Sequence, residues 1–324
     1  MKIAFFDSKP YDEEFFSPYQ SNEIKMKFFE TKLNEDTVSL SNGFDVVCVF
    51  VNDEINSFVI DKLYEYGVKL IALRCAGYNN VDLKFAKGKI GVVRVPAYSP
   101  YAVAEHTIAL LLTLVRNTHK AYIRTKSFNF SLNGLLGFDL HGKTVGIIGT
   151  GKIGCIFANI CKGFGMKILA YDKYPNPSLN IEYTSLEKLL KESDIISLHC
   201  PLSKETYHLI DKNAISLMKD GAIVVNTSRG ALVDSEALLD GIRTKKIGGA
   251  CLDVYEEESE LFFEDNSNLI VNDNTLALLM TMPNVIVTSH QAFFTKEALL
   301  NIAETTIDNV KEYLNTKTCK NEVF

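Results

Sequence analysis

Three groups with acid–base or charge chemistry occur at equivalent places in the second half of the sequence. Arg229, the glutamate run 256–258 and His290 each follow an apolar run of strand-like composition. A guanidinium can bind a substrate carboxylate through two parallel hydrogen bonds and polarise an adjacent carbonyl. A histidine can donate a proton to a keto oxygen or remove one from a hydroxyl, and a neighbouring carboxylate raises its pKa. Together these groups can bind a small acid and move a proton on it.

A glycine-rich turn adds a cofactor to this chemistry. The stretch Lys143–Asp172 predicts strand, turn, helix and strand, and Gly149, Gly151 and Gly154 match G-x-G-x-x-G in the turn. These glycines suit a sharp turn, the close approach of a pyrophosphate and tight packing of the helix on the sheet. Asp172 ends the second strand, where it can accept hydrogen bonds from both ribose hydroxyls and repel a 2′-phosphate. The stretch therefore predicts an NAD site.

Apolar runs at regular spacing supply the elements that must position these residues. Alternating strands and helices predict an α/β fold with a doubly wound parallel sheet, whose ligands bind at the carboxyl ends of the strands. Arg229, the glutamates and His290 are therefore expected at one rim, beside the nicotinamide. The six predicted strands are Thr144–Ile148, Lys167–Tyr171, Asp194–Leu198, Ala222–Asn226, Gly249–Asp253 and Val285–Thr288.

The first hundred residues predict a second, smaller α/β unit with a flavodoxin-like parallel sheet. Pro96–Pro100 marks a stiff crossing, and a last helix at Lys296–Leu314 is expected to return to this unit. We therefore expect a substrate domain made of residues 1–98 and 296–324, and an NAD-binding Rossmann domain made of residues 99–295. The predicted strands of the first unit are Ile3–Phe6, Lys25–Phe29, Val46–Phe50, Lys69–Leu73 and Val92–Val95.

One segment, Ala102–Arg124, predicts a single long helix that is apolar on nearly every side. Such a helix must be covered by protein all round, either in the core or at a subunit contact. The second alternative predicts a homodimer or a dimer-based oligomer.

The composition excludes several classes of function. The 324 residues are 47% hydrophobic and 23% charged with a net charge of −6, and they contain no basic cluster that would bind nucleic acid or anionic lipid. Neither a signal peptide nor a run long enough to span a bilayer is predicted. The seven cysteines are odd in number, scattered and without a C-x-x-C pair, which favours a reducing cytoplasm and no metal site.

Several long motifs are spread over nearly the whole chain, namely RCAGYNNVD (74–82), VPAYSPYAVAEH (95–106), GTGKIG (149–154), ISLHCPL (196–202), VNTSRGALVD (225–234), LDVYEEE (252–258) and SHQAFFT (289–295). In this order they resemble the D-2-hydroxyacid dehydrogenases. Within that family the chain is most similar to the bacterial fermentative D-lactate dehydrogenases, because Tyr98 and the insert with Phe262 and Phe263 match that branch.

The resemblance implies a role for each catalytic candidate. His290 would be the acid/base, Arg229 would bind the substrate carboxylate and carbonyl, and Glu258 would raise the pKa of the histidine. Among the three adjacent glutamates, the family pattern selects the one that lies five residues after Asp253. The implied reaction is reversible hydride transfer from NADH to pyruvate, giving D-lactate.

The resemblance also implies the binding residues. The substrate would contact Ala76, Gly77, Tyr98, Arg229 and Phe293. The residues implied for NAD are Gly149, Gly151, Ile153, Gly154, Asp172, Cys200, Pro201, Thr206, Thr227, Ser228, Arg229 and Asp253.

Some alternatives stay open at this point. The substrate could be another 2-oxo acid, giving phenyllactate or glycerate, and the fold also occurs in NAD-sensing corepressors that bind rather than react. Arg74 could face the substrate or form a structural ion pair. Asp253 could orient the cofactor or His290, rather than transfer protons. His106 and His199 are weaker candidates for a functional part than His290.

Overall fold

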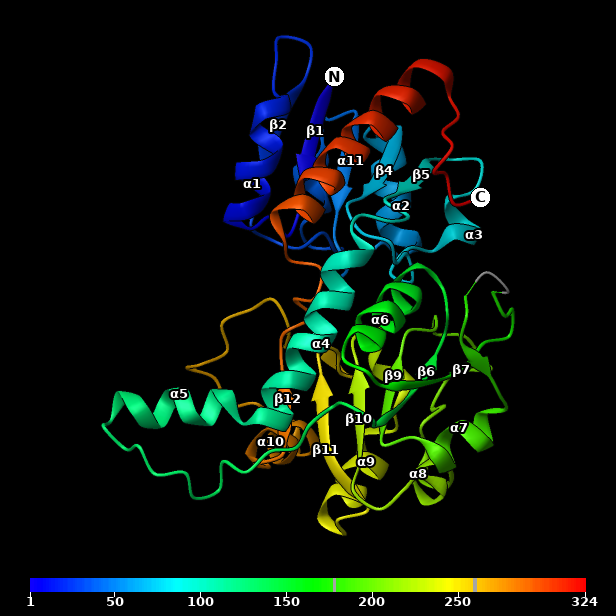
Figure 1. Cartoon of the computed structure of the whole chain (residues 1–324). Helices are drawn as coiled ribbons and strands as arrows, with labels where there is room; N and C mark the ends of the chain where they lie inside the picture. Colours follow the sequence, from blue (N-terminus) through cyan, green and yellow to red (C-terminus); the bar gives the residue numbers. More distant parts are fainter. Residues whose placement is uncertain (177–178, 259–260) are drawn as a thin grey trace. The chain divides into compact units, whose positions relative to one another are not determined.

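The computed structural model describes residues 1–176, 179–258 and 261–324. The chain forms two compact units, one made of Met1–Ser99 with Phe294–Phe324 and the other of Pro100–Phe293 (Figure 1). Each unit is an α/β layer structure with its own parallel sheet.

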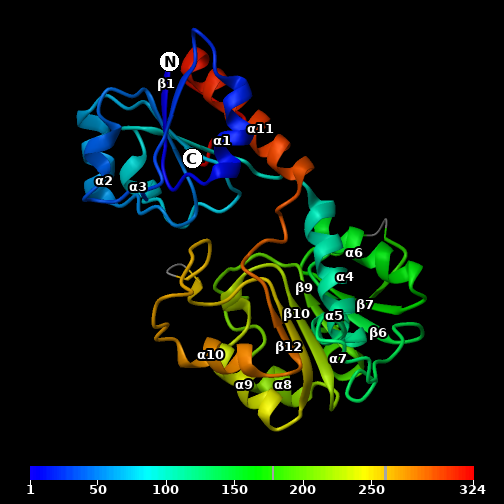
Figure 2. The same cartoon turned by 90° about the vertical axis from the view of Figure 1, so that its left-hand side faces the viewer.

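Unit 1 contains a five-stranded parallel sheet in the order β2-β1-β3-β4-β5. This order is that of flavodoxin-like folds, as the sequence predicted. Figure 2 shows α1 and α11 on one face of the sheet and α2 and α3 on the other. Each predicted strand is within one residue of the observed one at both ends. The elements are β1 (Lys2–Phe5), α1 (Pro10–Phe16), β2 (Lys25–Phe28), β3 (Val46–Val49), α2 (Ser57–Glu65), β4 (Leu70–Leu73), α3 (Leu83–Ala86), β5 (Gly91–Arg94) and α11 (Lys296–Thr316).

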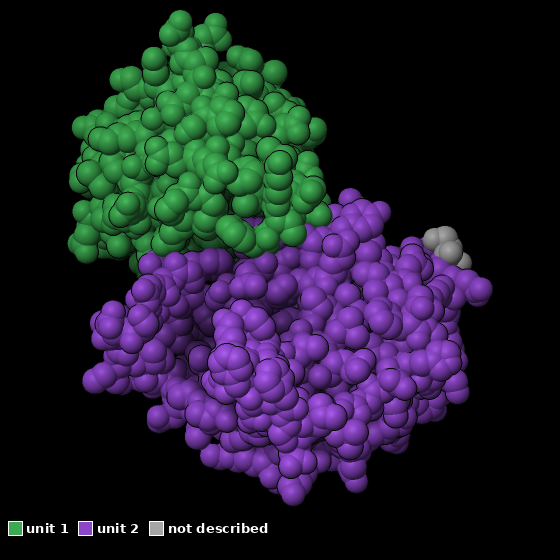
Figure 3. Space-filling view, turned by 60° about the vertical axis from the view of Figure 1, so that its left-hand side comes forward, with its two compact units in different colours: residues 1–99, 294–324 green, residues 100–293 purple. Residues whose placement is uncertain are grey.

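The chain crosses twice between the units, which Figure 3 shows in two colours. The crossings fall at 99/100 and 293/294, where the sequence placed them at 98/99 and 295/296.

Unit 2 contains a seven-stranded parallel sheet in the order β12-β11-β10-β9-β6-β7-β8. Its middle is the Rossmann order of two βαβαβ halves that meet at β6 and β9. The six predicted strands are confirmed within two residues, and β8 was missed. The elements are β6 (Thr144–Ile148), α6 (Lys152–Gly163), β7 (Lys167–Tyr171), β8 (Glu182–Tyr183), α7 (Leu186–Glu192), β9 (Ile195–Leu198), α8 (Lys212–Leu217), β10 (Ala222–Asn226), α9 (Ser235–Arg243), β11 (Ile247–Leu252), α10 (Asn274–Thr281) and β12 (Val285–Val287).

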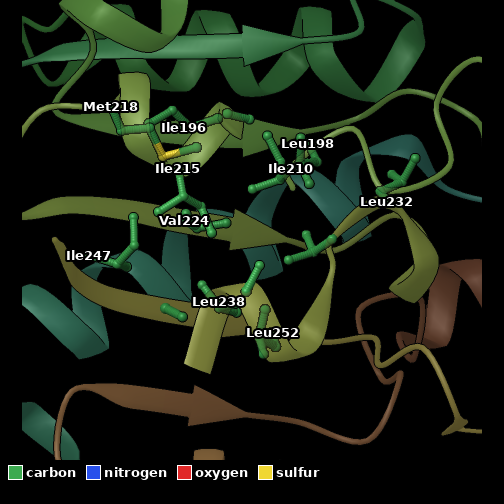
Figure 4. Packing of buried hydrophobic residues seen from close by; sticks show 14 of the residues in the cluster. Ile196, Leu198, Ile210, Ile215, Met218, Val224, Leu232, Leu238, Ile247 and Leu252 are labelled. Atoms are coloured by element: carbon green, nitrogen blue, oxygen red, sulfur yellow. The ribbon is translucent and has the colours of Figure 1, made fainter. Parts of the chain in front are cut away.

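Two apolar clusters hold helices on the two faces of this sheet. One joins the sheet to α6 and to α4, the helix Pro100–Arg116. The other joins it to α7, α8, α9 and α10, and Figure 4 shows strand residues such as Val224 packed against Ile215 and Leu238 of the helices. Because both faces are covered, the strands are apolar on both sides, as is usual for parallel sheets. The sheet is therefore a rigid support for the loops at its carboxyl edge.

The prediction of one long helix at Ala102–Arg124 is wrong. The structure has two helices, α4 and then α5 (Thr118–Lys126), separated by Asn117 with a left-handed φ of 51°. Asparagine tolerates this conformation better than most residues, and the apolar pattern that buries α4 ends at Val115. No residue of α5 is buried, and α5 with the start of the following loop extends away from the rest of unit 2 (Figure 1). The loop returns to the core at Leu140, which is buried.

Three further observations concern the chain as a whole. All seven cysteines are free thiols. Among the described residues, no helix is long and apolar enough to cross a membrane, and no group of three or more His, Cys, Asp or Glu side chains could hold a metal ion.

Candidate active site

The glycine-rich turn between β6 and α6 fits a dinucleotide. Gly149 has a φ of 97°, and a Cβ there would lie 2.6 Å from the backbone nitrogen of Cys200. A Cβ at Gly151 would meet nothing within 4 Å, so the backbone is open on that side. Gly151 caps α6 without a side-chain hydrogen bond, which leaves N–H groups at the positive end of the helix for an anion. These features suit a pyrophosphate.

Asp172 lies directly after β7, beside the same turn. Its carboxylate accepts hydrogen bonds from the Thr150 backbone (2.6 Å), the Thr150 hydroxyl (2.9 Å) and the Tyr174 backbone (2.8 Å). Partial burial acts to raise the pKa of Asp172, but these hydrogen bonds outweigh it and lower the pKa below its ordinary value. The group is therefore an anion in a fixed position, as a partner of ribose hydroxyls must be.

The remaining residues implied for NAD lie on loops after β9 and β10. The Ser228 hydroxyl donates to the Cys200 carbonyl (2.7 Å), and the Thr206 hydroxyl donates to the Pro201 carbonyl (2.7 Å). These bonds join the two loops to each other and close the first. Thr227 is buried and its hydroxyl pairs with that of Thr107 on α4, so its side chain serves the packing of the helix.

His290 is paired with the glutamate that the family pattern selected. Its Nδ1 lies 2.8 Å from Oε1 of Glu258, and Oε2 of Glu258 accepts a hydrogen bond from the backbone of Tyr255 (2.9 Å). An ionised carboxylate only accepts hydrogen bonds, so Nδ1 is the donor in this pair and Nε2 can bond another group. The ring of Phe263 lies 5.8 Å from the imidazole, centroid to centroid. This arrangement suits a general acid that becomes neutral when it gives up its proton.

Glu256, two residues earlier, has a different partner. Its Oε1 lies 2.7 Å from Nε2 of His208 and accepts a hydrogen bond from the Tyr207 hydroxyl (3.2 Å). The rings of Tyr207 and His208 are stacked at 4.0 Å. Glu256 and Glu258, which residue type alone does not distinguish, therefore have different histidine partners.

A paired substitution tests this separation. We expect Glu258→Gln to lower kcat roughly 10–100-fold, because the imidazolium loses its counter-charge. Glu256→Gln keeps its hydrogen-bonding shape toward His208, so its kcat should stay within about threefold of the wild type. Steady-state rates of both variants, compared per folded protein, measure the difference; equal losses would contradict the assignment of Glu258.

Arg229 begins the loop after β10, the strand that neighbours β11. Nδ2 of Asn226 donates to the Arg229 carbonyl (2.8 Å). A Cβ at Gly230 would lie 2.0 Å from the Tyr255 carbonyl group, so the Arg229 loop packs directly on the loop that leads to Glu258. Within the described part of the chain the guanidinium forms no ion pair; Nη1 donates only to the Ser228 carbonyl (2.7 Å). A half-buried cation without a protein anion is suited to an anionic substrate.

Asp253 is fully buried at the end of β11. Its carboxylate accepts hydrogen bonds from the Thr288 hydroxyl (2.6 Å) and the backbones of Gln291 (2.9 Å) and Ala292 (2.8 Å). Burial acts to raise its pKa, but hydrogen bonds from His106, Thr288 and Ala292 lower it overall. The sequence predicted that Asp253 orients the cofactor or His290. The contacts of its carboxylate are with the turn that carries His290, and its contact with NAD stays a prediction.

The other histidine at the strand ends, His199, is not suited to acid–base work. Its Nε2 lies 2.9 Å from the Ser197 hydroxyl and its ring packs 5.0 Å from that of Phe157. Burial lowers the pKa of His199 to about 3, so the imidazole is neutral at physiological pH.

Unit 1 carries the predicted residues Ala76, Gly77 and Tyr98. Arg74 is buried and forms an ion pair with Asp12 (3.0 Å), which favours the structural alternative for this arginine. Arg94 donates to the Ala76 carbonyl (2.8 Å), and its guanidinium lies 5.0 Å from the centre of the Tyr78 ring. The loop that holds the Ala76 and Gly77 N–H groups is thus fixed from both ends. Nδ2 of Asn301 on α11 donates to the Tyr98 carbonyl (2.7 Å).

Several residues of the catalytic loops were not singled out from the sequence. Tyr207, His208 and Thr288 carry no motif signal of their own, because their roles depend on partners 35 to 49 positions away in the chain. His208 could have been suspected only once its loop was placed beside Glu256.

Comparison with known proteins gives a consistent result. Residues 108–292 match the family model described as "D-isomer specific 2-hydroxyacid dehydrogenase, NAD binding domain". The chain is 50% identical over 331 residues to the D-lactate dehydrogenase of Escherichia coli strain K12, covering all of both chains. The apo-structure of D-lactate dehydrogenase from Escherichia coli superposes with a TM-score of 0.92, at 47% identity and full coverage of both chains. The pyruvate reductase of Chlamydomonas reinhardtii superposes with a TM-score of 0.94, at 43% identity and coverage of 99% and 98%.

Proposed function

The chain belongs to the D-isomer specific 2-hydroxyacid dehydrogenase family, and on that premise we propose that it is an NAD-dependent D-lactate dehydrogenase acting on pyruvate and D-lactate. The observation that carries the proposal is the pair of His290 with Glu258 on the loops of an NAD-binding domain. The full-length similarity to an enzyme named D-lactate dehydrogenase supports this choice of substrate.

The residues divide the chemistry among them. NADH supplies the hydride when it is bound. Arg229 binds the pyruvate carboxylate and polarises the keto group, while protonated Nε2 of His290 donates to the keto oxygen. Glu258 stabilises the imidazolium before the transfer and fixes its tautomer afterwards. In the reverse direction the neutral imidazole removes the hydroxyl proton of D-lactate.

The cofactor belongs to unit 2 and, in this proposal, the substrate contacts of unit 1 are Ala76, Gly77 and Tyr98. Unit 1 would then be the substrate domain and unit 2 the NAD domain. The resemblance implies that Tyr98 contacts the substrate, as in the D-lactate branch of the family, which favours pyruvate over a bulky 2-oxo acid.

A short series of substrates tests the choice of pyruvate. We expect kcat/KM with NADH to be highest for pyruvate and to fall for hydroxypyruvate and phenylpyruvate. A maximum at phenylpyruvate would favour the runner-up, a dehydrogenase for larger D-2-hydroxy acids. Absence of turnover with every 2-oxo acid would favour an NAD-sensing binding protein instead.

Asp172 sets the preference for NADH in this proposal. In Asp172→Ala, the kcat/KM for NADH divided by that for NADPH should fall by roughly 10–100-fold. One or two ribose hydrogen bonds, worth about 1–3 kcal/mol, would be lost with NADH. Asp172→Asn keeps much of the hydrogen bonding to Thr150 but removes the charge, so it isolates the repulsion of the 2′-phosphate. An unchanged ratio in both variants would refute the ribose role.

We further propose that the protein is a homodimer that assembles through α5 and the segment 127–138. This arm exposes large apolar side chains that a monomer would leave in water, including Phe128 at 85%, Leu132 at 82% and Leu136 at 93%. Burying one such side chain is worth roughly 1.5–3 kcal/mol. A second copy of the chain is the partner that closes such a surface by symmetry.

Light scattering after size exclusion tests the dimer. The wild type should have twice the chain mass of 36.2 kDa, and Leu136→Glu with Phe128→Glu should shift it toward the monomer. The control Tyr64→Glu changes an equally large exposed side chain on α2 and should leave the mass unchanged. A wild type that elutes as a monomer at micromolar concentration would contradict the proposal.

We also propose a cytoplasmic location, because the seven cysteines are scattered along the chain and all are free thiols.

A further inference from the structure

His290 has an unusual backbone conformation. Its φ is 54°, in the left-handed region that residues other than glycine seldom adopt. Such a conformation is strained and persists only where the surrounding structure holds it in place. Neighbouring groups must therefore hold the backbone of the turn 288–292, because the direction of the imidazole depends on that backbone.

Asp253 makes several hydrogen bonds that hold this turn. Its backbone carbonyl accepts a hydrogen bond from the His290 N–H (2.7 Å). Its carboxylate accepts from Thr288, Gln291 and Ala292, so donors on both sides of His290 converge on one side chain. A buried carboxylate is stable only while its hydrogen-bond partners stay in place.

His106 is the side chain that fixes the position of this carboxylate. Nε2 of His106 lies 3.3 Å from Oδ1 of Asp253 and 3.3 Å from the Thr288 hydroxyl. Because that hydroxyl donates to Asp253, its oxygen is left to accept a hydrogen bond from Nε2. Within the described part of the chain, His106 is the one basic side chain that pairs with Asp253. It comes from α4, far from the turn in sequence.

Packing of α4 does not by itself require this contact. The helix is fixed on the sheet by apolar side chains such as Ala104, Ile108 and Leu111. The polar face at His106 and Thr107 meets instead two loops of the site, through Thr288 and Thr227. The histidine therefore serves the loops more than the helix.

We propose that His106 is a positioning residue for the dehydrogenase reaction. It holds Asp253 and the Thr288 hydroxyl, and these keep the backbone of His290 in its left-handed conformation. In that conformation Nδ1 pairs with Glu258 and Nε2 faces the substrate. This inference rests on the proposed role of His290 as acid/base. It predicts that a substitution at His106, which itself takes no part in proton transfer, lowers the rate of the chemical step.

Two pairs of variants test the proposal in the full-length protein. His106→Leu and Thr288→Val remove the polar contacts, whereas His106→Gln and Thr288→Ser retain a donor or hydroxyl at each position. His141→Gln replaces an exposed histidine and is the control. We expect kcat for pyruvate to fall roughly 10–100-fold in the first pair and to stay within about threefold of the wild type in the second, because small misplacements of a reacting group have effects of this size. The Kd of NADH should change less than about threefold in all five.

A second readout separates positioning from general destabilisation and does not depend on the substrate. In protein labelled with ¹³C-histidine, the Cε1–Hε1 signal of His290 can be identified by its loss in His290→Gln. It should shift or broaden in His106→Leu and in Thr288→Val, and match the wild type in Thr288→Ser and His141→Gln. An unchanged His290 signal together with an unchanged kcat in His106→Leu would overturn the inference. If the wild type turns over no 2-oxo acid, the proposed function fails, while the His290 signal still decides the positioning role.

Discussion

Replacing His290 by alanine is expected to lower kcat for pyruvate reduction by roughly 10²–10⁴-fold, with the affinity for NADH largely intact. Among the described residues of unit 2, His290 is the histidine whose Nδ1 pairs with a fixed carboxylate and whose Nε2 can bond another group. Its removal takes away the proton donor for the developing alkoxide without touching the glycine turn or Asp172. Steady-state rates and fluorescence titration with NADH measure the two effects separately.

The matched control for this variant is His141→Ala, because His141 is exposed. It should keep wild-type kcat and NADH affinity. A His290→Ala enzyme with near-normal turnover would show that the proton comes from another group, and the assignment of the site would fail.

Replacing Arg229 by glutamine is expected to lower kcat/KM for pyruvate by roughly 10²–10³-fold. The loss of a charged hydrogen-bonding partner in a desolvated pair costs about 2–5 kcal/mol, and each 1.4 kcal/mol is a factor of ten. Arg229→Lys keeps the charge but lacks the planar fork, so it should recover only part of the loss. The exposed Arg243→Gln is the control and should behave as the wild type.

The same experiment distinguishes binding from folding. Arg229 forms no ion pair within the described residues and donates only to the neighbouring Ser228 carbonyl, so its loss should leave the melting temperature nearly unchanged. The KM for pyruvate should rise by a larger factor than the Kd for NADH, because Arg229 is implied as a contact of both. A large fall in stability with unchanged kinetics per folded molecule would mean that the guanidinium is structural.

The sheets and the cofactor turn could be predicted because their signals are local. Buried parallel strands are continuous apolar runs, and the turn of Gly149 combines a special backbone angle with a close approach. β8 was missed because two residues, Glu182 and Tyr183, are too few to show a period. The long helix was mispredicted because the break at Asn117 is a change of backbone angle in a stretch without the glycine or proline that usually marks the end of a helix.

The site was predictable in its residue types more than in its contacts. Strand ends brought Arg229, Glu258 and His290 to one rim, yet only the family pattern distinguished Glu258 from Glu256. The structure adds the physical difference, since one glutamate faces His290 and the other faces His208. The sequence suggested that Asp253 orients either the cofactor or His290, but its individual contacts could not be predicted, because its donors lie 35 to 39 residues later.

The most direct measurement is the absorbance of NADH at 340 nm on addition of pyruvate to the purified protein, followed by chiral analysis of the product. We expect NADH to be consumed in proportion to pyruvate and the product to be D-lactate. Absence of NADH consumption, or formation of L-lactate, would contradict it.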